Sequence, residues 1–177
     1  IKAVETAVHS LSAGETDLFI CGCVDPAGDV RPCLLNQADV KNRPDCPPSE
    51  GAAAIVLKRY DQAIQDNDRI YAVVTGVGAS GGDRIPGETA AAPEYTQQLY
   101  LQSLTAAVEQ AGIRMEDLEL LETPSLKKIA TAPITRQTDV SAVIGQTQAA
   151  SSLFSIVQTA LCLYLQQLPV SGVPNGL

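Results

Sequence analysis

The sequence predicts an α/β fold in which helices cover the faces of a sheet. Short apolar runs rich in β-forming residues alternate along the chain with longer stretches of helical periodicity, and glycine or proline separates many of them. This alternation is typical of layered α/β domains. The 177 residues suffice for one domain with its own core. Because aromatic residues are scarce and Trp is absent, that core must consist mainly of Ala, Val, Leu and Ile.

The first part of the chain predicts a helix followed by a buried strand. Residues 2–13 carry apolar side chains at helical spacing, and Gly14 marks the stop of this helix. Residues 17–24 form a short apolar run that indicates a strand. Residues 25–50 hold five prolines and little periodicity, so a long surface loop is expected there.

The middle of the chain predicts two more strands with a short helix between them. Residues 52–58 and 70–77 are the strands, and residues 60–67 are the helical turn. The third strand leads into a glycine-rich loop that extends to Gly82.

The last part predicts two helices and two short strands. Residues 95–111 and 149–166 have broad apolar faces of helical period, and residues 118–121 and 140–144 read as strands. Residues 127–139 are irregular. We expect all five strands to form one mixed sheet, with both helices packed on it. The inward positions expected for the last helix are Leu153, Ile156, Val157, Ala160, Leu161, Tyr164 and Leu165.

Composition and charge exclude several classes of function. The formal net charge is −8, which argues against a nucleic-acid partner, since phosphate contacts need Lys and Arg. No apolar run reaches the roughly 18 residues of a membrane span. No signal-peptide pattern is visible, so a cytoplasmic location without membrane attachment is expected.

The cysteines and the single histidine do not indicate a metal site or a nucleophile. The five cysteines lack a Cys-x-x-Cys pair, and a zinc site would need almost all of them beside His9. We expect reduced, half-buried thiols, and buried apolar surroundings would make them inert. His9 is expected to be an exposed or half-buried residue of the first helix. The cysteines are Cys21, Cys23, Cys33, Cys46 and Cys162.

Three stretches of the sequence, taken in order, resemble the β-ketoacyl synthase (ketosynthase) family. Residues 9–17 (HSLSAGETD), leading into CGCV at 21–24, resemble the family's helix that ends "SLRSGE-D" and its strand that ends "AGGV". Residues 50–76 resemble "GEGAGVVVLKRLSDAL-DGDRIYAVIRG" nearly position for position. Residues 144–151 (IGQTQAAS), with ALCLY at 160–164, are similar to "NIGHTQAAAG" and "ALCLYH".

This resemblance implies a thiolase-like fold, with layers in the order α-β-α-β-α, and a partial domain. Residues 1–177 would be the middle and C-terminal part of one ketosynthase-like domain, which in the family is more than twice as long. The catalytic cysteine of the family would then lie before Ile1, outside the sequence.

The resemblance also implies that the chemistry of condensation is lost. Ketosynthases combine a cysteine at a helix N-terminus, where its pKa is lowered, with two histidines and a supporting lysine. Here Pro124 stands at the first histidine position, Ser141 at the lysine position and Gln146 at the second histidine position. Neither proline nor glutamine can act as an acid or base near neutral pH. We expect Pro124 and Gln146 to lie within about 15 Å of each other, as facing catalytic side chains do, and residues 25–50 to run close to the same site.

Two other patterns have simpler explanations than catalysis. Residues 76–82 look superficially like a phosphate-binding loop, but no Gly-Lys-Ser/Thr ending follows. In the family this region shapes the acyl pocket. The acidic residues Glu116, Asp117, Glu119 and Glu122 are expected to form a solvated face.

Two hypotheses about function follow, and a third is weaker. The first is a non-catalytic scaffold or chain-length-determining partner, similar to the chain length factors and acyltransferase-linked regions of polyketide and polyunsaturated fatty-acid synthases. The second is an active β-ketoacyl synthase or acyltransferase whose nucleophile lies upstream, and the third is an unrelated small-molecule α/β enzyme. The family implies ketosynthase, acyltransferase or acyl carrier domains as partners, in a homo- or heterodimer. No cofactor would bind directly, but the parent system would use a phosphopantetheine-linked acyl carrier protein.

Overall fold

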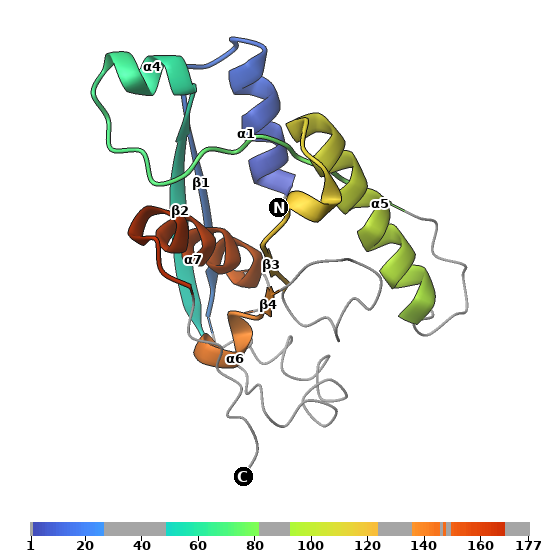
Figure 1. Cartoon of the computed structure of the whole chain (residues 1–177). Coiled ribbons are helices and arrows are strands. Elements are labelled where there is room, and N and C mark those ends of the chain that lie inside the picture. Colours follow the sequence, from blue (N-terminus) through green and yellow to red (C-terminus); the bar gives the residue numbers. More distant parts are fainter. Residues whose placement is uncertain are drawn as a thin grey trace. The chain divides into compact units, whose positions relative to one another are not determined.

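The structure is a computed structural model (Figure 1). Its internal contacts divide it into two compact units. The first unit comprises residues 1–73, 122–126 and 138–177, and the second comprises 74–121 and 127–137. The residues that the structure describes are 2–26, 49–81, 93–123, 136–145, 147 and 150–168. Among them, no helix is long and apolar enough to cross a membrane.

The first predicted helix is confirmed as α1, Lys2–Ser12. It buries Val4, Ala7 and Leu11 along one face. Gly14 follows the end of the helix as expected, with a φ of 71° that suits a residue lacking Cβ. The Gly14 amide donates to the Leu11 carbonyl at 3.1 Å, which satisfies an acceptor that the helix end would leave unpaired.

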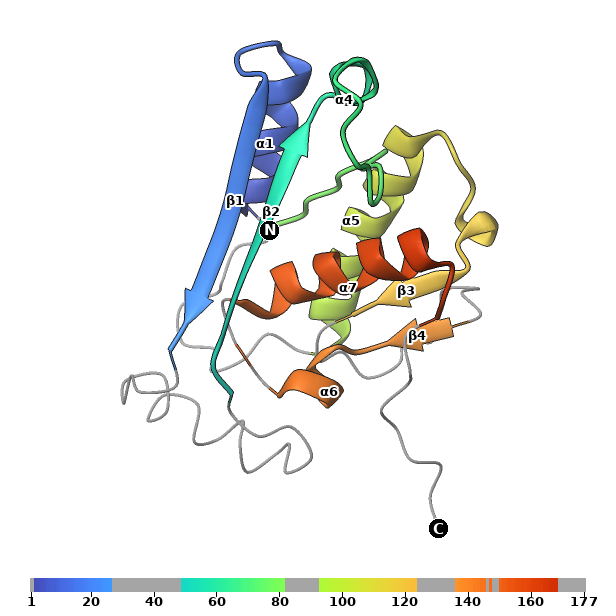
Figure 2. The same cartoon turned by 90° about the vertical axis from the view of Figure 1, so that its left-hand side faces the viewer.

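The first two predicted strands are confirmed as β1, Leu18–Asp25, and β2, Gly51–Lys58. They form an antiparallel pair (Figure 2). Cys21 lies opposite Ile55 in its register. Alternate side chains of such a pair point to opposite faces. The face that carries these two residues packs against α1, and its other members, Phe19, Cys23, Ala53 and Leu57, border the same core.

The last predicted helix is confirmed as α7, Ser151–Leu165, but its inward face is shorter than expected. Leu153 is buried in the core beside Cys21, and Ile156 packs against that core. Leu161, Tyr164 and Leu165 are exposed instead of inward. The prediction for these three is wrong because only the N-terminal half of α7 contributes to the core of the first unit.

The helical turn predicted at residues 60–67 is confirmed as α4, Tyr60–Gln65. Its C-terminal turn is held by Lys58, whose Nζ donates to the carboxylates of Asp66 and, at 2.6 Å, Asp68. These contacts raise the pKa of Lys58, chiefly through the hydrogen bond to Asp66.

The strand predicted at residues 70–77 is not present in the described part of the chain. A strand requires a hydrogen-bonded neighbour, and the described residues show no strand paired with this segment. Within the second unit, the Val77 amide donates to Oε1 of Gln110 at 2.6 Å, and the Ser80 hydroxyl donates to the Leu99 carbonyl. Both acceptors belong to α5, Pro93–Ala111, which confirms the predicted helix at 95–111.

The remaining strands are short, and one of them lies earlier in the chain than expected. The strand predicted at 118–121 appears as β3, Leu120–Glu122, after a 3-10 turn, η1, at Met115–Asp117. Its partner is β4, Arg136–Thr138. The strand predicted at 140–144 is wrong, because these residues begin the helical turn α6, Ser141–Ile144.

The cause of this difference is Asp139. Its Oδ1 accepts the backbone amide of Ser141 at 2.9 Å and also the Ser141 hydroxyl. When an Asp side chain accepts the backbone amide two residues ahead, it stabilises a turn in the chain. That turn forms in place of an extended strand. Instead of one mixed sheet of five strands, the described residues therefore form two separate two-stranded sheets, β1–β2 and β3–β4.

Candidate functional site

The centre of the candidate site is a polar junction around Glu122, at the end of β3. Its Oε1 accepts the Val140 amide at 2.7 Å and the Ser155 hydroxyl at 3.3 Å. Its Oε2 accepts the Thr138 hydroxyl. One half-buried carboxylate thereby joins β3 to β4, to the residue before α6 and to the second turn of α7. We call Glu122, Thr138, Val140 and Ser155 the Glu122 junction.

Ser141, which the resemblance assigns to the lysine position, lies beside this junction at the start of α6. It is only 3% exposed. Both its amide and its hydroxyl donate to Asp139, so the residue shapes the turn after β4. A short neutral hydroxyl engaged in this way cannot supply the positive charge that a lysine brings to an active site.

The backbone leading to the other two family positions is also buried. Thr123, which precedes Pro124 in the sequence, is 3% exposed and donates its amide to the Thr138 carbonyl at 2.9 Å. Thr147, which follows Gln146, is 1% exposed, and its hydroxyl bonds that of Ser151 at 3.2 Å. Pro124 and Gln146 themselves lie outside the described residues. Their expected proximity therefore stays a prediction.

The start of β2 meets α7 through a glycine. A Cβ placed on Gly51 would lie 2.7 Å from Cε2 of Phe154 and 3.3 Å from the Thr147 methyl carbon. Only a residue without a side chain allows this approach. On the neighbouring strand, the Cys23 thiol lies 3.9 Å from the carbonyl of Ala150, just before α7. Most of the loop expected at residues 25–50 lies outside the described residues, so its path near this site also stays a prediction.

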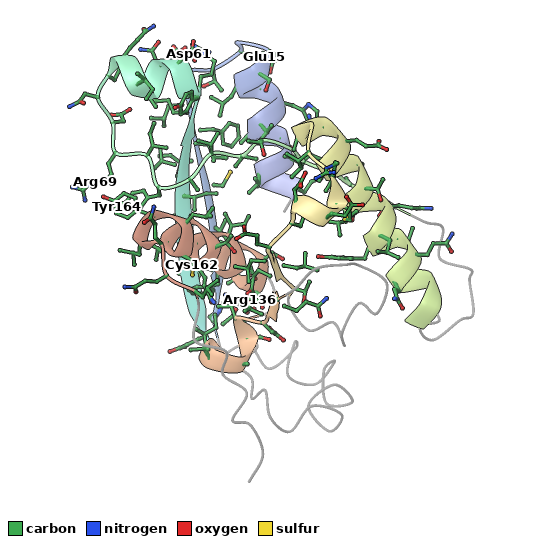
Figure 3. All side chains as sticks on the ribbon, in the orientation of Figure 1. Glu15, Asp61, Arg69, Arg136, Cys162 and Tyr164 are labelled. Atoms are coloured by element: carbon green, nitrogen blue, oxygen red, sulfur yellow. The ribbon has the colours of Figure 1, made fainter. Side chains whose placement is uncertain are left out.

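The histidine and two of the cysteines have the environments expected of them. His9 is exposed on α1. Burial raises the pKa of the Cys21 thiol, which lies in the core and is 2% exposed. Cys162, labelled on α7 in Figure 3, is half-buried, and its pKa is raised by burial and by the nearby Glu122 carboxylate. Raised pKa values disfavour the thiolate, which is the nucleophilic form.

The acidic cluster divides into a solvated part and a structural part. Glu116, Asp117 and Glu119 are exposed as expected, and the Arg114 guanidinium donates to Asp117 at 2.8 Å, which lowers the pKa of that carboxyl. Glu122 does not belong to this face, so the expectation is wrong for it. A sequence signal was available, since Glu122 ends an otherwise apolar strand, where a carboxylate needs buried donors.

The glycine-rich segment is used for packing within the second unit. A Cβ on Gly76 would lie 2.1 Å from the Ala107 carbonyl oxygen, and one on Gly78 would lie 1.9 Å from that of Ser103. The glycines therefore bring the backbone directly onto α5. The Val77 amide in this segment donates to Gln110, so it is not free to bind a phosphate.

Comparisons with known proteins point to one class. No protein-family model matches the chain. Probable polyketide synthase 1 of Dictyostelium discoideum is 31% identical over 139 residues, which is 69% of this chain and 4% of that protein. A PKS-NRPS hybrid synthetase of Aspergillus niger is 27% identical over 197 residues, 96% of this chain and 11% of that protein. The chain thus spans only a small fraction of these relatives' length.

Solved structures agree on the fold. The ishigamide ketosynthase/chain length factor superposes with a TM-score of 0.76 at 21% identity, covering 96% of this chain and 46% of that one. The ketosynthase from module 6 of the bacillaene synthase of Bacillus subtilis 168 gives 0.70 at 20% identity, covering 90% of this chain and 34% of that one. The expected thiolase-like fold in partial extent is confirmed.

Proposed function

Because the chain is a ketosynthase-like domain of the polyketide synthase type, we propose that it is a non-catalytic member of that class. Its role would be that of a scaffold or chain-length-determining partner in acyl-chain assembly. We also propose that residues 1–177 form the middle and C-terminal part of a single domain.

The observation that carries the proposal is Ser141. The family resemblance assigns this position to the supporting lysine, and here it holds a buried hydroxyl bonded to Asp139. The resemblance places Pro124 and Gln146 at the two histidine positions. A positioned general acid or base contributes about 10²–10⁴-fold to rate. Losing both histidines would leave condensation close to the uncatalysed rate, even with a thiolate nearby.

The polar groups around these positions support the same role. The Glu122 carboxylate holds three donors, and the hydroxyls of Thr147 and Ser151 bond each other. Among the described residues, no buried side-chain nitrogen or oxygen lacks a hydrogen-bond partner. Bonds of this kind suit a structural role for these groups.

The partners of such a domain would come from its parent synthase. We propose a catalytic ketosynthase as the direct partner, in a dimer, with acyltransferase or acyl carrier domains nearby. Acyl intermediates would arrive on the phosphopantetheine arm of the carrier, so this domain itself would hold no cofactor.

The test is decarboxylative condensation by the full-length domain, supplied with an acyl-primed and a malonyl-loaded carrier. A Pro124→His, Ser141→Lys and Gln146→His triple variant is measured beside it, as are the single variants. We expect no ketoacyl product from the domain alone, and product once a separate ketosynthase is added and binds it. Single variants should rescue little, because such groups act as a unit. Clear product from the unmodified domain would instead favour an active enzyme with an upstream nucleophile.

A further inference from the structure

We draw no further inference here: the strongest candidate, the outer face of the β1–β2 sheet on which Ile20, Val24 and Val56 are exposed, carries nothing because nothing in the described part of the structure shows what covers it.

Discussion

The Glu122 junction gives a prediction whose magnitude follows from its hydrogen bonds. Glu122→Ala removes the acceptor of the Val140 amide and of two hydroxyls. Val140 is 4% exposed and its amide is fixed by the backbone, and an unsatisfied buried donor costs about 1–3 kcal/mol. The hydroxyls of Thr138 and Ser155 can rotate toward other acceptors, so they add less. Since Glu122 is half-buried and water can replace part of the loss, we expect about 2–3 kcal/mol in total.

Urea unfolding measures this loss as a change in the free energy of unfolding at unchanged m-value. Glu122→Gln keeps one oxygen that can accept from Val140 and Ser155, but its NH2 group cannot accept the Thr138 hydroxyl, so about 1 kcal/mol is expected. Glu119→Ala is the matched control, because Glu119 is an exposed glutamate three residues away. It should stay within about 0.5 kcal/mol of the unmodified chain. If Glu122→Ala also stays within that range, the junction does not stabilise the fold and the reasoning is wrong.

Three further predictions concern packing, pH and thiol chemistry. Gly78→Ala should lower the free energy of unfolding in urea by about 1–3 kcal/mol, because the new Cβ would meet rigid helix backbone. Gly81→Ala, which has open space around it, should leave that free energy unchanged. Equal effects of the two substitutions would refute the packing. The pKa of Asp66 is held below its ordinary value of 3.8, chiefly by Lys58, so its contribution to stability is present above that pH and lost as pH falls through the folded pKa. As pH falls from about 5 to 2, the free energy of unfolding of Asp66→Asn should therefore fall less than that of the unmodified chain. An equal fall in both chains would count against the ion pair. Cys21 should resist iodoacetamide in the native chain and react only in urea, as read by peptide mass spectrometry; rapid native labelling would contradict its burial.

The elements that local sequence predicted well are those whose pattern is long or self-contained. α1, α5 and α7 repeat apolar residues at helical spacing over several turns, and β1 and β2 are compact apolar runs. Residues 140–144 are too short for their period to distinguish a strand from a helix. The Asp139 side chain decided the outcome there, by capturing the Ser141 amide.

The strand expected at residues 70–77 failed for a different reason. Its β-branched residues suit a strand, but a strand forms only when an adjacent strand exchanges backbone hydrogen bonds with it. Part of that backbone is engaged instead by Gln110, 33 residues from Val77 in sequence. The exposed C-terminal half of α7 is a similar case, since periodicity identifies an apolar face but not what covers it.

By itself, the sequence predicted the fold class of this protein and, through the family resemblance, the residue types expected at the catalytic positions. The three family stretches point to a ketosynthase-like fold, and Pro124, Ser141 and Gln146 differ chemically from the residues that condensation requires. Only the tertiary structure decided what Ser141 and Glu122 bond to, which glycines press on α5 and that Phe154 covers Gly51. Most of these contacts join residues that are far apart along the chain, and the others depend on the geometry of a side chain. The spacing of residues along one segment reveals neither long-range contacts nor side-chain geometry.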